Sequence, residues 1–284
     1  MQKATLGRTG LSVSRLGFGG APMGIPNCLS PDDRDSKAFH AAGVAAIREA
    51  VARGITYFDT APGYGQGRSE RVFGEGLEGR RDGVVLATKY TFGDGLTRER
   101  FIENVAASLD RLRTDHVDIL QFHGGYFDDA YAGRILASGV LDGVDEAQAK
   151  GLCRFRGITA EGPSGGLERL LRTGRFDTLM IAYNLIYQST CNHANQPTGI
   201  IPFAKSLGLG VTTMRLTTCG FLQKLFSADI DPAKLTRRAI NFVLSSPEVD
   251  CCVVGMRNAE EVADNVALAE GERLEIEALH NRFA

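Results

Sequence analysis

The sequence predicts an α/β fold, a (β/α)8 barrel of the TIM type. Short apolar runs alternate with longer amphipathic segments along the whole chain, and eight of these runs have the length and β-branched content of strands. The runs lack polar alternation, which is typical of a parallel sheet covered on both faces. The 284 residues also fit a barrel of about 250 residues with decorations. We therefore expect one domain that spans residues 1–284.

Strands and helices are expected in strict alternation. The first helix has Ala, Val and Ile at spacings of three and four, and Gly54 ends it; Ser69 and Thr97 are candidate caps of the next two. The predicted strands are 11–20, 55–60, 84–90, 116–125, 153–160, 178–185, 210–216 and 250–256. The predicted helices are 38–54, 69–79, 97–113, 140–151, 164–174, 198–208, 232–246, 259–271 and a final helical tail at 272–284.

A doubly wound open sheet is the competing fold. It usually carries a glycine-rich turn that opens the helix after its first strand. The nearest match, GFGGAPMG, contains Gly17, Gly19 and Gly20, but about 20 residues of loop follow it instead of a helix. The glycines therefore argue against the open sheet.

Composition excludes several classes of protein. The formal charge is −2 and no basic run stands out, which argues against nucleic acid or anionic membrane as a partner. No apolar run reaches the roughly 18–20 residues of a membrane span, and we expect no signal peptide. The six cysteines show no metal-ligand spacing, and Cys251 and Cys252 are expected to be buried thiols. These features favour the reducing cytoplasm.

Polar residues that are costly to bury stand at three successive strand ends. These are Asp59, Lys89 and His123, and Tyr64 follows the first of them closely. Active groups of such barrels lie at the C-terminal strand ends, so we expect the four side chains to meet at the barrel mouth. A buried Asp and Lys would each be costly unless they pair.

The four groups suit protonation of a carbonyl oxygen. A phenol is a weak acid at neutral pH, and a nearby ammonium stabilises its phenolate and lowers its pKa. Asp59 would keep Lys89 charged and oriented, and His123 would donate a hydrogen bond to the same oxygen or relay the proton. The set predicts a site where hydride reaches carbon as a proton reaches oxygen.

At this point the chain resembles an aldo-keto reductase. GITYFDTAPGYGQGRSERVFGEGL is similar to the segment of that family that bears its Asp and Tyr, VVLATKY to its Lys strand, and DILQFHGG to its His strand. KATLGRTGLSVSRLGFGG resembles its N-terminal β-hairpin and first strand. YNLIYQ, FAKSLGLGV and VVGMRNAEEVADN resemble its later, cofactor-side elements.

The resemblance implies a function and a cofactor. Tyr64 would be the general acid in reduction and the base in oxidation, with Lys89, Asp59 and His123 in the roles given above. The cofactor would be NADP, with NAD as the alternative, and no metal is implied. The expected cofactor-binding residues are Gly19, Gly20, Asp59, Thr159, Met214, Arg215, Leu216, Gly255, Arg257 and Asn265.

Several cofactor positions depart from the family pattern. Ala160 and Met180 replace an expected Asn and Gln, and Met214 stands in the segment that usually holds an aromatic or a Ser-Pro-Leu sequence. Glu261 replaces a basic residue, and its charge would repel a 2′-phosphate, whereas Arg257 could pair with one. The preference between NADP and NAD is therefore open.

The substrate is expected to be a small aldehyde, ketone or sugar. Loops after strands one, four and seven (23–38, 126–134 and 216–226) would form the pocket walls, with Tyr90, Tyr126 and Phe127 as an apolar or sugar-stacking face. Two other functions stay open. One is a lyase or isomerase that uses the same acid–base set without net hydride transfer, and the other is a non-catalytic nucleotide-binding subunit. The sequence leaves the reaction direction and oligomeric state open.

Overall fold

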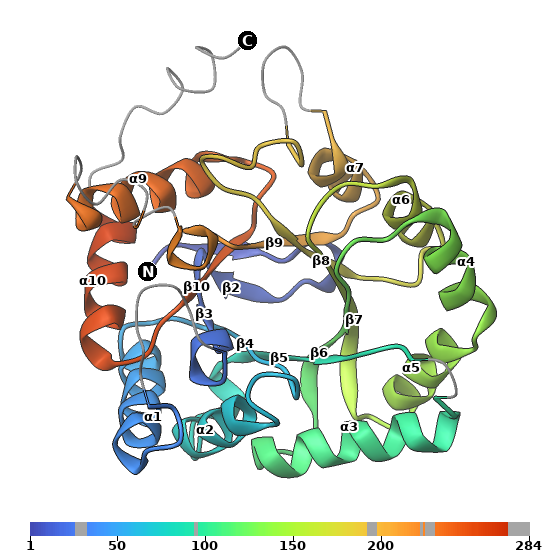
Figure 1. Cartoon of the computed structure of the whole chain (residues 1–284), viewed down its shortest axis with the longest axis horizontal. Coiled ribbons are helices and arrows are strands. Elements are labelled where there is room, and N and C mark those ends of the chain that lie inside the picture. Colours follow the sequence, from blue (N-terminus) through green and yellow to red (C-terminus); the bar gives the residue numbers. More distant parts are fainter. Residues whose placement is uncertain (26–32, 94–95, 192–197, 222–223, 225–230, 272–284) are drawn as a thin grey trace.

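A closed parallel barrel forms the molecule's centre (Figure 1). The computed structural model describes residues 1–25, 33–93, 96–191, 198–221, 224 and 231–271. Within these residues, eight strands close in the order β10-β3-β4-β5-β6-β7-β8-β9, and helices surround them. The predicted fold class is therefore confirmed. The strands are β3 (Leu16–Gly19), β4 (Tyr57–Asp59), β5 (Val85–Tyr90), β6 (Val117–His123), β7 (Cys153–Ala160), β8 (Thr178–Ala182), β9 (Gly210–Met214) and β10 (Cys251–Gly255).

Five of the described helices around the barrel begin where a side chain accepts a hydrogen bond from a backbone N–H of the first turn. Ser36, Thr97, Asp128, Ser164 and Asn258 do this, each for the backbone N–H three residues on. The helices are α1 (Lys37–Ala52), α2 (Arg68–Gly76), α3 (Arg98–Leu112), α4 (Asp129–Ala137), α5 (Val140–Ala149), α6 (Gly165–Arg172), α7 (Ile200–Ser206), α9 (Pro232–Ser245) and α10 (Ala259–Glu270).

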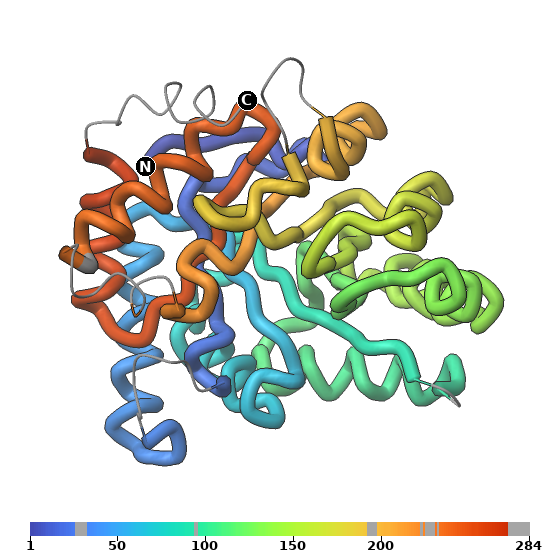
Figure 2. The backbone as a smooth tube through the Cα atoms, turned by 45° about the horizontal axis from the view of Figure 1, so that its top comes forward, coloured from blue at the N-terminus to red at the C-terminus, as the bar shows by residue number. Residues whose placement is uncertain are grey.

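An antiparallel hairpin closes the N-terminal end of the barrel. Its strands are β1 (Lys3–Thr5) and β2 (Ser12–Ser14), as the family resemblance implied. Leu6 and Val13 are fully buried in an inner cluster with Tyr57, Ile119 and other residues of the barrel interior. The first residue lies beside the last described helix (Figure 2), where the Met1 amino group pairs with Glu270 at 2.7 Å.

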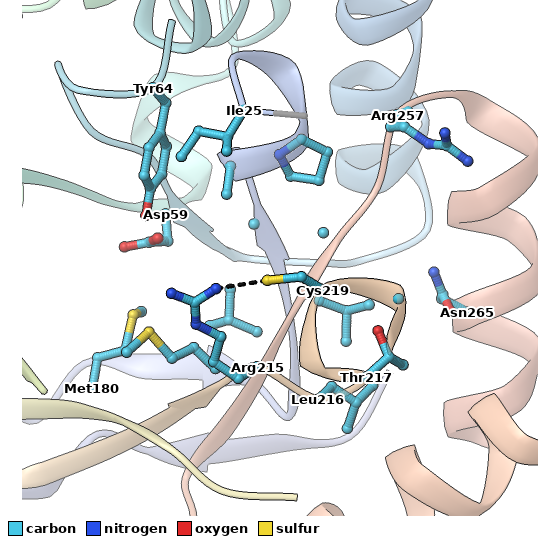
Figure 3. Close-up of a pocket in the computed structure, with 18 of the residues that line it drawn as sticks. Ile25, Asp59, Tyr64, Met180, Arg215, Leu216, Thr217, Cys219, Arg257 and Asn265 are labelled. Carbon is cyan, nitrogen blue, oxygen red and sulfur yellow. Dashed lines mark hydrogen bonds between the residues drawn. The ribbon is translucent and has the colours of Figure 1, made fainter. Parts of the chain in front are cut away.

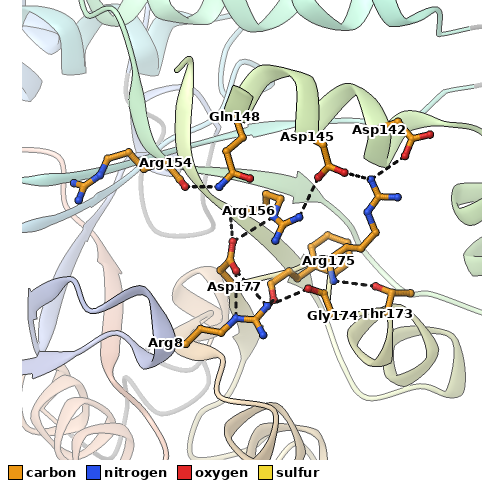
Figure 4. A network of polar contacts seen from close by, with 11 residues as sticks. Arg8, Asp142, Asp145, Gln148, Arg154, Arg156, Thr173, Gly174, Arg175 and Asp177 are labelled. Carbon is orange, nitrogen blue, oxygen red and sulfur yellow. Dashed lines mark hydrogen bonds and ion pairs between the residues drawn. The ribbon is translucent and has the colours of Figure 1, made fainter. Parts of the chain in front are cut away.

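A polar network fastens this hairpin to the barrel (Figure 4). Asp177, which precedes β8, accepts a hydrogen bond from Arg8 Nε at 3.2 Å and from the backbone N–H of Arg156 at 2.9 Å. Arg156 in turn pairs with Asp145 of α5 at 3.0 Å. The carboxylate thus joins the hairpin turn to β7 and α5 at the end of the barrel opposite the strand ends that carry Asp59 and Lys89.

Two expectations about the chain's elements need comment. Residues 126–134 were expected to form a loop, but α4 begins at Asp129, because the Asp128 carboxylate caps it by accepting from Tyr131 N at 2.6 Å. The expected helical tail at 272–284 lies outside the described residues. Among the described helices, none has the length and apolar character needed to cross a membrane.

Candidate active site

Three neighbouring strands, β4, β5 and β6, bring the predicted polar residues to the C-terminal end of the barrel. In the parallel register, Asp59 is paired with Ala87, Lys89 with Gln121, and His123 with Thr159. Successive side chains of a strand point to opposite faces, so Lys89 and Ala87 face the same side, as do Gln121 and His123. That side is the barrel interior, where these groups meet.

Asp59 and Lys89 form a buried ion pair. Lys89 Nζ lies 2.7 Å from Asp59 Oδ2 and also donates to the backbone oxygen of Thr60 at 2.8 Å. Gln121 Nε2 donates to Asp59 Oδ1 at 2.7 Å, so both carboxylate oxygens are bound. All three side chains are almost fully buried. These direct hydrogen bonds offset the free energy lost when the two charges leave water, as a buried ion pair requires.

Tyr64 comes from the turn between β4 and α2. Its N–H donates to Ala61 O at 3.1 Å, and its carbonyl accepts from Ser69 N at 3.2 Å, so the turn holds the residue in place. The Lys89 ammonium lies 4.8 Å from the centre of the Tyr64 ring. The ring stands edge-on to His123, with centroids 5.7 Å apart and planes at 85°. The four predicted catalytic side chains thus lie together, each next to at least one other.

Burial dominates the acidity of Tyr64. Burial raises the pKa of the phenol above its ordinary value, and the Asp59 carboxylate raises it further, whereas the charge of Lys89 and its hydrogen bond oppose the rise. Lys89 thus lowers the pKa of Tyr64 as expected, but burial outweighs it and the net pKa lies above the ordinary value. At neutral pH Tyr64 carries its proton, which is the form that a proton donor needs.

The pKa values of Lys89 and His123 are shifted in opposite directions. Burial alone would lower the pKa of Lys89, but the Asp59 carboxylate and the Tyr64 phenol outweigh it and raise the value. Burial, together with the positive charges of Lys89 and Arg215, lowers the pKa of His123 to about 4. Lys89 is therefore a cation at neutral pH and His123 is neutral.

A cavity of about 860 Å³ opens from these groups across the barrel mouth (Figure 3). Tyr64 and Asp59 lie on one side of it, and Arg257 and Asn265 lie on the opposite side. Most of the predicted site residues line it: Gly19, Asp59, Tyr64, Lys89, His123, Thr159, Met214, Arg215, Leu216, Gly255, Arg257 and Asn265. Gly20 does not; its N–H donates to Asp59 O at 2.7 Å and its carbonyl accepts from Ser69 Oγ at 2.9 Å.

The predicted substrate face is not in the cavity, which corrects that expectation. Tyr90 follows the inward-facing Lys89, so its ring points outward and packs edge-on against Phe101 and Phe122. Phe127 is fully buried between Phe122 and Tyr131. Tyr126 is 68% exposed and is not among the residues that line the cavity.

Glu161 and Cys219 line the cavity but were not selected from the sequence, and both contact Arg215, which was selected. Arg215 and Glu161 form a two-bond ion pair at 2.7 and 3.1 Å, which joins the ends of β9 and β7 over the cavity, and Arg215 also donates to Cys219 Sγ at 2.6 Å. Gln121, which holds Asp59, was also missed. Its signal was present, because it lies two residues before His123 and shares its face.

Of the positions that depart from the family pattern, some line the cavity and others do not. Met180 and Met214 line the cavity, whereas Ala160 is fully buried and does not. The Thr159 hydroxyl is engaged with the backbone of Gly124, from which it accepts at 3.1 Å. The thioethers of Met180 and Met214 are weak hydrogen-bond acceptors, so this part of the cavity wall offers few strong hydrogen bonds.

The cavity fits a nicotinamide dinucleotide. Its volume lies in the range of ligand sites, and polar residues line both sides of it, Tyr64 and Asp59 on one and Arg257 and Asn265 on the other. Thr159, Met180, Met214 and Arg215 would hold the nicotinamide half beside Tyr64. Arg257, just before α10, and Glu261 and Asn265, within it, would hold the adenosine half.

Comparison with known proteins agrees with this geometry. A sequence model of the Aldo/keto reductase family matches residues 15–238. The chain is 30% identical to L-galactose dehydrogenase of Arabidopsis thaliana over 293 residues, which cover 92% of this chain and 86% of that protein. It is 28% identical to the NADH-specific methylglyoxal reductase of Escherichia coli over 251 residues, which cover 82% of this chain and 72% of that protein.

Solved structures show the same fold. An aldo-keto reductase from Klebsiella pneumoniae in complex with NADPH superposes with a TM-score of 0.78 at 21% identity, covering 100% of this chain and 95% of that one. The holo form of an aldo-keto reductase from Bacillus halodurans gives 0.77 at 24% identity, with 100% and 96% covered. With the barrel, the site and the family match in agreement, the chain belongs to the aldo/keto reductase family, a family of NAD(P)H-dependent oxidoreductases.

Proposed function

We propose that this protein reduces a small aldehyde, ketone or sugar to its alcohol, or catalyses the reverse oxidation, with Tyr64 as the general acid–base. One observation carries the proposal. The Tyr64 phenol lies against a buried ammonium, Lys89, whose charge is fixed by Asp59 at 2.7 Å, and all three line one cavity. Such a set delivers and recovers a proton at a carbonyl oxygen.

Each residue has a part in the proton transfer. A bound reduced nicotinamide supplies the hydride that the carbonyl carbon receives. The Tyr64 hydroxyl gives its proton to the carbonyl oxygen, so that a carbonyl, a hydride and a proton give an alcohol. The phenolate left behind is stabilised by the Lys89 ammonium, and Asp59 keeps that ammonium charged and in place. In oxidation the phenolate takes the proton back.

His123 orients the substrate in this scheme. Its pKa of about 4 keeps the imidazole neutral at pH 7, so it offers one N–H donor without a second positive charge beside Lys89. A neutral donor polarises the carbonyl and does not compete with Tyr64 for the role of acid.

The names of the relatives support a small polar substrate. L-galactose dehydrogenase acts on a sugar and methylglyoxal reductase on a small dicarbonyl, as their names state. We also propose that residues 1–284 form one barrel domain that works in the cytoplasm. Cys251 and Cys252 are buried thiols, and buried thiols of this kind are typical of proteins in a reducing compartment.

Steady-state kinetics of the purified chain tests the function. NADH and NADPH are each mixed with a panel of small aldehydes, ketones and aldoses, and oxidation is followed by the absorbance of the reduced nicotinamide. Tyr64→Phe should lower kcat by about 10²–10⁴-fold while dinucleotide binding is kept, because only the proton donor is lost. Tyr126→Phe, at an exposed position outside the cavity, is the matched control.

The competing functions give different outcomes in the same assay. Product that forms without loss of the reduced nicotinamide would indicate a lyase or isomerase. Binding of a dinucleotide without turnover of any carbonyl, in a chain whose Tyr64→Phe variant behaves like the wild type, would indicate a non-catalytic subunit.

A further inference from the structure

The start of α10 carries an ion pair at the far end of the cavity. Arg257, just before the helix, donates from Nε to Glu261 Oε1 at 2.9 Å, and a second guanidinium nitrogen binds the same oxygen. The backbone N–H of Arg257 donates to Glu261 Oε2 at 2.7 Å. Both residues line the cavity, and Figure 3 shows Arg257 across it from Tyr64. The guanidinium is thus already bound to a carboxylate of its own chain.

Glu261 occupies the place where this helix would otherwise attract an anion. A helix N-terminus favours negative charge, and an unpaired arginine beside it would favour a phosphate. Two backbone N–H groups at this point already have partners within the chain, because Asn258 accepts from Glu261 N at 2.8 Å and Glu261 accepts from Arg257 N. The carboxylate therefore supplies the negative charge itself.

The charges around this end of the cavity are unfavourable to a further anion. Asp264, one turn along α10, also lines the cavity, so the helix presents two carboxylates against the one guanidinium of Arg257. Ala233 and Thr236, which line the cavity from α9, are uncharged. A phosphate monoester carries about −1.5 to −2 at pH 7 and would add to this negative charge.

Resting on the proposed function, we propose that Glu261 selects NADH over NADPH. The two dinucleotides differ only by the 2′-phosphate on the adenosine ribose. If Arg257 bound that phosphate with the nitrogens that now hold Glu261, the Glu261 carboxylate would be left beside a dianion, and the like charges would repel. A ribose with a free 2′-hydroxyl donates a hydrogen bond to a carboxylate instead, as acidic residues do in other NAD sites.

Lys224 is the other cation to consider. Among the described lining residues, Lys89, Arg215 and Arg257 each pair with a carboxylate that also lines the cavity, and Lys224 comes from the segment after β9. If the 2′-phosphate were held there, selection by Glu261 would fail. The test therefore includes Lys224→Gln.

Calorimetric titration of the full-length protein with NADH and with NADPH tests the inference without any need for turnover. The wild type should bind NADH at least about tenfold more tightly than NADPH. Glu261→Gln keeps the shape of the side chain and removes its charge. It should therefore tighten NADPH binding and lower the ratio of the NADPH Kd to the NADH Kd severalfold. Glu261→Lys should invert it. Glu260→Gln removes the same charge from the same turn at an exposed position outside the cavity, and it should leave the ratio unchanged.

The outcomes separate the two proposals. If neither dinucleotide binds, the proposed function itself fails. If NADPH binds as tightly as NADH, or if Glu261→Gln changes the ratio no more than Glu260→Gln does, selection by Glu261 is overturned while the reductase function stands. Selective loss of NADPH binding in Lys224→Gln would also overturn it, because the phosphate would then have a different partner.

Discussion

Gln121 binds the one oxygen of Asp59 that Lys89 leaves unused. Its Nε2 donates to Oδ1 at 2.7 Å, while the ammonium takes Oδ2 at 2.7 Å. The register of β5 and β6 sets this arrangement, since Lys89 and Gln121 are paired and both reach towards β4. The carboxylate that fixes Lys89 is therefore itself fixed by a neutral amide from the next strand.

We expect Gln121→Met to impair positioning and stability together. The variant keeps the length of the side chain but leaves a buried carboxylate oxygen without its donor, which costs about 1–3 kcal/mol. Urea unfolding measures that loss. kcat should fall because Lys89 is held less firmly, while KM for the dinucleotide changes little, since Gln121 does not line the cavity.

Gln148→Met is the control for that substitution. Gln148 donates to Arg154 O at 2.6 Å at an exposed position, where water replaces the lost bond. Equal losses of stability in the two variants would show that the bond to Asp59 has no special weight. If the Gln121→Met variant had wild-type kcat, the proposal that Gln121 helps to position Lys89 would be contradicted.

Lys89→Met should lower activity and stability through different physical effects. It removes the charge that stabilises the Tyr64 phenolate, so kcat should fall by orders of magnitude. It also leaves Asp59 buried without its partner, and breaking a buried pair costs about 3–5 kcal/mol. The double variant Asp59→Asn, Lys89→Met should recover much of the stability but none of the activity, because it strands no charge.

Lys150→Met provides the comparison for Lys89→Met. Lys150 pairs with Glu146 at 3.3 Å on the surface of α5, and such pairs contribute about 0–1 kcal/mol. If the double variant were as unstable as Lys89→Met alone, the loss would arise from packing and not from the stranded carboxylate.

The sequence was sufficient for the barrel and for the catalytic groups, for a physical reason. Eight strand signals of uniform buried character admit few arrangements, and strand ends meet at one face of such a barrel. Asp59, Lys89 and His123 stand at the ends of strands that are neighbours both in the sequence and in the barrel. At these three positions the local sequence pattern is therefore enough to show that the side chains meet in the fold.

Prediction failed where a residue's direction or its partner decides its role. Tyr90 was expected in the substrate face, although it follows the inward-facing Lys89 and adjacent residues of a strand face opposite sides. The pairs Arg215–Glu161 and Arg257–Glu261 depend on loop and cap geometry that hydrophobic periodicity does not encode. The net acidity of Tyr64 depends on burial that only the fold reveals.

Tyr90→Phe should leave the kinetics unchanged. The ring lies outside the barrel against Phe101 and Phe122, and within the described part of the chain its hydroxyl has no hydrogen-bond partner. Removal of an unpaired buried hydroxyl leaves stability unchanged or raises it. Thermal melting and kcat/KM for two carbonyl substrates check both points; a rise in KM for either would return Tyr90 to the substrate site.

His123 should make stability depend on pH in the mildly acidic range. Its pKa is about 4 in the folded chain and near 6.5 when unfolded, so between these values the unfolded chain binds a proton that the folded chain does not. Stability from this residue is therefore complete above about pH 6.5 and is lost as the pH falls towards 4, by at most about 1.4 kcal/mol per pH unit before solvent screening. His123→Gln removes the titrating group, so its free energy of unfolding should fall less than that of the wild type between pH 7 and pH 5. Urea unfolding of both proteins at each pH measures the difference. Parallel curves would mean that the half-buried His123 imidazole takes up its proton in the folded state as readily as in the unfolded chain, against the combined effect of burial, Lys89 and Arg215.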